Sequence, residues 1–134
     1  MGLDNGLMLR TRKQIDPNLV PSYVKITAEP TNDALVFEYE VCYWRKCWNI
    51  RDMIFNCLGD VGKDNSSCEV SISALESIRD GIYEFLCNGD DWEDSIWDFD
   101  EMIDHLSLDI VNLSWVINYL KEDPHAYVYF YDSY

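Results

Sequence analysis

Carboxylates are the most conspicuous chemical groups of the chain, and they gather in its second half. The densest stretch runs from residue 90 to residue 109 and holds Asp90, Asp91, Glu93, Asp94, Asp98, Asp100, Glu101, Asp104 and Asp109. Carboxylates on a rigid helix present negative charge at spacings comparable to those of a phosphate backbone, and they steer association with basic proteins. Trp92, Trp97 and Phe99 are interleaved with them and would supply the desolvated anchors of an interface.

Three interpretations of this acidic stretch compete. It is a solvated face, a site for calcium or magnesium, or a surface that imitates nucleic-acid phosphates on a basic partner. The cation site is disfavoured, because the stretch lacks the calcium-loop pattern of alternating Asp or Asn followed by Gly and a terminal Glu. The third interpretation assigns partner binding to nine residues, namely Asp90, Asp91, Glu93, Asp94, Trp97, Asp98, Asp100, Glu101 and Asp104.

Arg51 is a second candidate, because it projects into the apolar arc of a predicted helix. That helix is predicted from Tyr43 to a stop at Gly59, since Tyr43, Cys47, Ile50, Ile54 and Cys57 repeat at helical spacing. A charge in such an arc is unfavourable unless it is paired and hydrogen-bonded. Asp4 is the partner that the sequence suggests. Arg51 is then either a structural or surface cation, or part of a pocket formed by Asp4, Tyr43 and Arg51.

Other catalytic signatures are missing from the sequence. It has no P-loop, no glycine-rich dinucleotide fingerprint, no paired-histidine zinc motif and no nucleophile elbow, so we expect no enzyme, cofactor or metal site. His105 is expected to be a solvated surface residue, with a general base as the alternative. The five cysteines lack C-x-x-C spacing and are expected to be free, core-packed thiols in a reducing compartment.

Length and charge bound the class of protein. The 134 residues, 48% of them hydrophobic, suit one domain spanning 1–134 and exclude a disordered chain. Residues 59–134 carry three Lys or Arg against 18 Asp or Glu and account for the whole net charge of −15. Direct binding of nucleic acid or an anionic membrane through this half is disfavoured, and a basic partner is expected. No signal peptide or membrane-spanning stretch is found, which predicts a cytoplasmic protein.

The elements that must position these residues follow from hydrophobic periodicity. Strands are predicted around residues 6–12, 23–27, 34–40, 68–72 and 126–131. A second helix is predicted after a capping box of Ser73 and Glu76, with Leu75, Ile78, Ile82, Phe85 and Leu86 as its buried stripe. The order of elements predicts an α+β domain, in which a small, mostly antiparallel sheet packs against about three helices on one face.

A long helix is predicted from Phe99 to Leu120, near the C-terminus. Its apolar residues repeat at spacings of four and three without a miss. A second apolar row lies on the opposite side and consists of Leu108, Val111, Trp115 and Tyr119. Either the helix is packed on two sides within the core, or this second row is an exposed surface for a partner or for a homodimer.

Three segments carry a resemblance to a known family. The start Met1-Gly2-Leu3-Asp4, the segment Tyr43-Trp44-Arg45-Lys46 followed by Ile50, and the ending Tyr129-Phe130-Tyr131-Asp132-Ser133-Tyr134 are the matching parts. They resemble small phage and prophage proteins without an assigned activity, which open with MGLD, carry a Y-W-R-K helix and close on an aromatic-Ser-aromatic tail. The family usually has His at the position of Arg51. The resemblance implies a phage-encoded protein in the cytoplasm of an infected or lysogenic bacterium.

These observations favour a protein that acts by binding another protein. The first hypothesis is an anti-defence inhibitor of the anti-CRISPR type, which occupies a basic nucleic-acid-binding surface of a host protein through its acidic helix. The second is a small enzyme or ligand-binding domain with the pocket of Asp4, Tyr43 and Arg51. The third is an immunity protein against a nuclease toxin, which would use the same electrostatics as the first.

Overall fold

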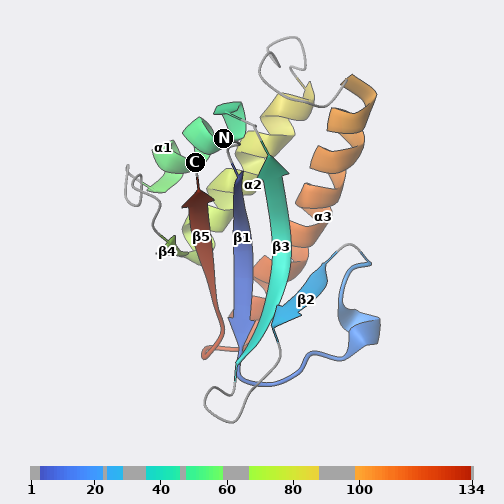
Figure 1. Cartoon of the computed structure of the whole chain (residues 1–134), viewed down its shortest axis with the longest axis vertical. Coiled ribbons are helices and arrows are strands. Elements are labelled where there is room, and N and C mark those ends of the chain that lie inside the picture. Colours follow the sequence, from blue (N-terminus) through green and yellow to red (C-terminus); the bar gives the residue numbers. More distant parts are fainter. Residues whose placement is uncertain are drawn as a thin grey trace.

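The computed structural model describes residues 4–22, 24–28, 36–45, 48–58, 67–87 and 99–133. The strands are β1 (Asp4–Thr11), β2 (Lys25–Ala28), β3 (Phe37–Arg45), β4 (Ser67–Val70) and β5 (Tyr127–Ser133). The helices are a short 3-10 turn η1 (Pro17–Leu19), α1 (Trp48–Leu58), α2 (Ile72–Cys87) and α3 (Phe99–Glu122). All strand pairs are antiparallel, in the order β2-β3-β1-β5-β4, and the three α-helices lie on one face of the sheet (Figure 1). The predicted α+β architecture is therefore confirmed.

The central strand, β1, determines which side chains face the helices. It pairs with β3 on one side and β5 on the other, so that Gly6 stands opposite both Tyr43 and Tyr131. Successive side chains of a strand point to opposite faces. Leu7 and Leu9 belong to the core, so Gly6 and its two tyrosine neighbours belong to the opposite surface. We call this surface of the sheet, opposite the helices, the outer face.

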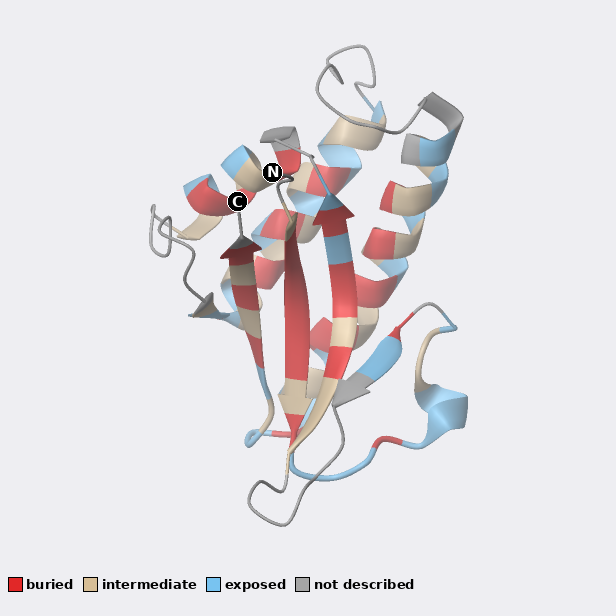
Figure 2. Ribbon diagram, in the orientation of Figure 1, coloured by how far each residue is buried: buried red, intermediate tan, exposed pale blue. Residues whose placement is uncertain are grey.

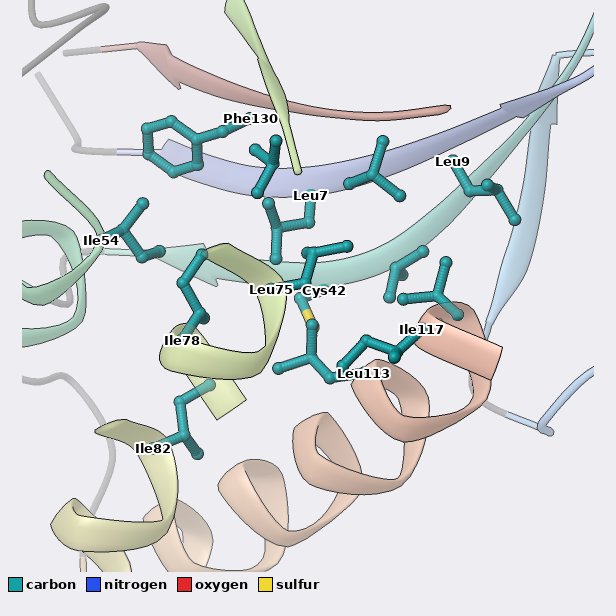
Figure 3. Packing of buried hydrophobic residues seen from close by; sticks show 14 of the residues in the cluster. Leu7, Leu9, Cys42, Ile54, Leu75, Ile78, Ile82, Leu113, Ile117 and Phe130 are labelled. Carbon is teal, nitrogen blue, oxygen red and sulfur yellow. The ribbon is translucent and has the colours of Figure 1, made fainter. Parts of the chain in front are cut away.

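Apolar side chains fill the layer between the sheet and the helices. Figure 2 shows that burial is concentrated along β1 and on the inward sides of the helices. Figure 3 shows Leu7 and Phe130 of the sheet pointing toward Ile54 of α1, Ile78 of α2 and Leu113 of α3. All five are fully buried, and burial of each such side chain contributes about 1.5–3 kcal/mol. This core fixes α1 and α3 against the sheet, and both helices carry the polar groups described below.

The first helix begins later than the sequence predicts. Tyr43 and Trp44 belong to β3, and α1 begins at Trp48, so the prediction of a helix from Tyr43 is wrong. Aromatic residues favour strands, and these two alternate as strand residues do, with Tyr43 36% exposed and Trp44 fully buried. They pair with Gly6 and Asn5 of β1, and this pairing outweighs the helical spacing.

The other two helices agree more closely with the sequence. The cap of α2 is Ser71 rather than Ser73, since the Ser71 hydroxyl accepts a hydrogen bond of 3.1 Å from the Ala74 N–H. The long helix is confirmed as α3, with Leu106 and Leu113 fully buried on its inward side. Among the helices in the described ranges, none combines the length and apolar character needed to cross a bilayer.

Candidate functional site

A buried carboxylate on α3, Asp109, is the centre of a polar cluster beneath the edge of the sheet. The side chain of Asp109 is only 4% exposed. The Trp44 indole N–H donates a hydrogen bond of 2.7 Å to Asp109 Oδ2, and the His105 Nδ1 atom lies 3.3 Å from the same oxygen. Cys42 of β3 lies beside the same carboxylate, and its thiol and Asp109 line one pocket. Residues of β3 and α3 therefore converge on one acidic group.

The cluster lies beside a pocket between α3 and β3. The pocket has a volume of about 190 Å³ and is lined by Lys25, Glu40, Val41, Cys42, Tyr43, His105, Leu108, Asp109 and Asn112. Asn112 closes its inner side, because its amide donates a hydrogen bond of 3.0 Å to the Val41 carbonyl. The polar lining is rich in acceptors, which suits a ligand that donates hydrogen bonds.

The acid–base character of the cluster does not favour cysteine catalysis. Burial, and next the negative charge of Asp109, raise the pKa of the Cys42 thiol well above its ordinary value. A thiol nucleophile requires the opposite shift, so the raised pKa and the burial of Cys42 disfavour a role in catalysis. Within the described residues, no group of three or more His, Cys, Asp or Glu side chains is arranged to hold a metal ion.

Arg51 is paired within the fold, with a partner other than the one suggested by the sequence. Its guanidinium donates two hydrogen bonds of 2.9 Å to the two carboxylate oxygens of Asp132 on β5. The side chains are 12% and 0% exposed, and the guanidinium also lies 4.7 Å from the centre of the Phe55 ring. The predicted apolar surroundings of Arg51 are confirmed, but the compensating carboxylate is Asp132 rather than Asp4.

The other two residues of the predicted pocket do come together, on the outer face. The Tyr43 hydroxyl donates a hydrogen bond of 2.7 Å to Asp4 Oδ1, and Arg45 lies 4.0 Å from the same oxygen. Arg51 projects from α1 to the helix side of the sheet, where it meets Asp132. The structure thus divides the three residues between two faces and joins Tyr43 to the pocket beside Asp109.

Six of the nine residues of the predicted acidic surface lie outside the part of the chain that the structure describes. Asp90, Asp91, Glu93, Asp94, Trp97 and Asp98 lie outside the described residues, and Asp100 is placed only as part of α3. Glu101 and Asp104 are exposed on the first turns of α3. Asp109, by contrast, is not on the surface with the rest of the acidic stretch.

The second apolar row of α3 is only partly accessible. Trp115 and Tyr119 stack with ring centroids 6.0 Å apart and pack against the core, and Leu108 lines the pocket. Val111 is 55% exposed. The row therefore covers part of the core, and Val111 is its most accessible member. A homodimer through this row stays a prediction.

The sequence does contain a signal for the buried carboxylate. Asp109 follows Leu106 by three residues and precedes Leu113 by four, which places it on the buried side of the helix. The alternation of Tyr43 and Trp44 indicates in the same way that Trp44 is buried if this segment is a strand. No local pattern indicates Asp132, because its partner lies 81 residues away in the sequence.

Comparison with known proteins does not assign this chain to a family. No protein-family profile, no curated protein and no solved structure matches the chain. The fold and site together define an α+β protein with helices on one face of the sheet, an acidic helical end, a polar cluster around one buried carboxylate and a tyrosine-rich outer face.

Proposed function

We propose that the protein binds a basic protein of a bacterial host and covers that protein's nucleic-acid-binding surface, as an anti-defence inhibitor of the anti-CRISPR type would. The observation that carries this proposal is the distribution of charge. Residues 59–134 hold 18 acidic residues against three basic ones, and no Lys or Arg occurs between Arg79 and Lys121. A surface of one sign attracts a partner of the other sign and imitates the phosphates that the partner normally binds.

The fold supports a rigid presentation of part of this charge. α2 and α3 run antiparallel side by side, so the end of α2 lies near the beginning of α3 (Figure 1). Glu84 of α2 and Glu101 and Asp104 of α3 are exposed in this region, while the opposite sides of both helices are anchored in the core. Rigid carboxylates lose little conformational entropy on binding, which favours affinity.

The proposal is tested by capturing a partner with two variants of equal charge. The full chain, immobilised, is incubated with host lysate in the presence and absence of nuclease. The variant Glu101→Lys with Asp104→Lys is compared with the control Glu69→Lys with Glu122→Lys, whose replaced side chains are also exposed. We expect the first variant to lose the partner and the control to retain it, because local charge complementarity rather than net charge determines binding.

Two further measurements decide whether the binding is inhibitory. Binding of the captured protein should weaken steeply with salt, and its affinity for its own nucleic acid should fall when this chain is added in equal amount. Equal loss of capture in both variants, or capture that disappears with nuclease, would contradict the proposal. The second result would show that nucleic acid bridges the two proteins.

A second candidate function is a ligand-binding or enzymatic domain, and the pocket beside Asp109 favours it. His105 and Asp109 lie 3.3 Å apart at this pocket, an arrangement that orients an imidazole for proton transfer. The test is the variant His105→Gln, measured by thermal shift against a library of small amines and amides. A ligand that stabilises the original chain but not this variant would support the pocket function over the inhibitor.

A further inference from the structure

The outer face of the sheet already holds one arginine side chain in a complete site. The Arg10 Nε atom donates a hydrogen bond of 2.9 Å to Glu38 Oε2, and its Nη1 donates one of 3.1 Å to the Tyr127 hydroxyl. The guanidinium lies 4.4 Å from the centre of the Tyr129 ring, and the Tyr129 hydroxyl donates to the same Glu38 oxygen. A carboxylate and aromatic rings thus bind a guanidinium by charge, hydrogen bonds and cation–π contact.

A second carboxylate on the same strand has no such cation. Glu40 follows Glu38 by two residues and faces the same side, but its neighbour in the register of β1 is Met8 where Glu38 has Arg10. Glu40 is half-buried, and among the described residues it has no hydrogen-bond or ion-pair partner. Lys25 of β2 is its other register neighbour and is exposed without an ion pair to it. A half-buried, uncompensated carboxylate favours binding of an external cation.

Aromatic groups stand beside Glu40, as they do beside Glu38. Tyr43 and Tyr131 occupy one row of the outer face, on either side of Gly6. The Tyr131 ring lies over Gly6, where a side chain at that position would meet its Cε1 at 2.9 Å. Burial, and next the negative charge of Glu40, raise the pKa of the Tyr131 hydroxyl.

We propose that Glu40, Tyr43 and Tyr131 form a binding site for an arginine side chain of a basic polypeptide partner. The site repeats the chemistry of the Arg10 site, with the cation supplied from outside. A polypeptide is favoured as the source, because the outer face is broad and is left open by the helices, and because a chain of net charge −15 attracts a basic segment (Figure 1). The site does not use Glu101 or Asp104, so it stands or falls independently of the α3 surface.

The test is an NMR titration of the full chain, labelled with ¹⁵N, with the blocked peptide Gly-Gly-Arg-Gly-Gly. We expect saturable shifts at amides of β1, β3 and β5 around Gly6, and weaker binding of the matched peptide with Lys, which lacks the planar fork and stacks less well. Glu40→Gln should weaken binding about tenfold, as expected for loss of a charge-assisted hydrogen bond. The control Glu69→Gln changes net charge equally on the same face and should leave the affinity within about twofold.

Two more variants separate a change in the binding site from a loss of the fold. Tyr43→Leu removes an aromatic ring from a residue that is 36% exposed, and it should lower the affinity for the arginine peptide without unfolding the chain. Lys25→Met removes the neighbouring ammonium and should strengthen binding. Equal effects of Glu40→Gln and Glu69→Gln would overturn the proposal in favour of non-specific attraction. Free arginine that binds as tightly as the peptide would overturn the polypeptide as the natural source.

Discussion

Replacement of Arg51 by alanine decides whether this buried cation serves the fold or a ligand. The variant leaves the Asp132 carboxylate, whose side chain is 0% exposed, without its bidentate partner. Removal of one member of a buried ion pair costs about 3–5 kcal/mol, because the remaining charge is neither solvated nor paired. Native domains are stable by about 5–15 kcal/mol, so this loss is a large fraction of the total.

The expected loss translates into measurable unfolding transitions. With an unfolding entropy near 2.1 cal/mol/K per residue, the loss lowers the melting temperature of this 134-residue chain by about 11–18 °C. Urea unfolding followed by tryptophan fluorescence and circular dichroism measures the same difference. Arg45→Ala is the matched control, since the Arg45–Asp4 pair is exposed and 4.0 Å long and should cost less than about 1 kcal/mol.

The double variant Arg51→Met with Asp132→Asn removes the ion pair without leaving an unpaired charge in the core. It therefore separates the lost interaction from the free-energy cost of burying an unpaired carboxylate. A neutral amide is far less costly to bury than a carboxylate, so we expect this variant to be more stable than Arg51→Ala. A loss below about 1 kcal/mol in Arg51→Ala would refute the reasoning, because it would mean that Asp132 is solvated or paired otherwise. A stable Arg51→Ala chain that no longer binds its partner would identify Arg51 as a functional residue.

Three further predictions follow from buried groups. Burial alone would raise the pKa of Asp123, but hydrogen bonds from the Tyr119 hydroxyl and the His125 N–H outweigh it and hold the pKa below its ordinary value of 3.8. The ionised carboxylate therefore stabilises the fold above about pH 4. This contribution is lost as the pH falls through the lower pKa of the folded state. The stability difference between the original chain and Asp123→Asn, measured by urea unfolding from pH 2 to pH 7, should therefore shrink at the acid end. In thiol titration with a disulfide reagent at about pH 8, exposed Cys87 should react much faster than Cys42, which is buried with a raised pKa and reacts only as the chain unfolds. Gly6→Ala should destabilise by about 1–3 kcal/mol in the same urea assay, because its Cβ would stand 2.5 Å from the Cys42 carbonyl oxygen; no loss would show that the two strands separate easily.

Periodicity predicted the helices and strands wherever one pattern acted alone. The alternation of Val128 and Phe130 with tyrosines identified β5, and the regular spacing from Phe99 to Leu120 identified α3. It failed at Tyr43 and Trp44, where helical spacing continued across the junction between β3 and α1. Pairing with β1 decided the conformation there, and pairing is a long-range property that a local window does not contain.

The same limit applies to the polar groups. The sequence indicated that Arg51 needed a buried anion, since an apolar arc surrounds it, but it could not select Asp132 among many carboxylates. The sequence pattern described the acidic stretch as one surface. In the structure, Asp104 of α3 is exposed, whereas Asp109 of the same helix is buried. A count of charges gives the sign of a region, but only the folded structure shows which charges are buried and which group pairs with each.

The contrast between Glu38 and Glu40 shows why burial and pairing must be known together before a site is inferred. In the sequence the two residues are equivalent members of one alternating strand. In the sheet, the register gives Glu38 an arginine and Glu40 a methionine as neighbours on β1. A half-buried carboxylate that makes no hydrogen bond or ion pair costs stability, since the neighbouring Lys25 ammonium offsets its desolvation only in part. The presence of such a charge beside Tyr43 and Tyr131 therefore favours a role in recognition over a role in stability.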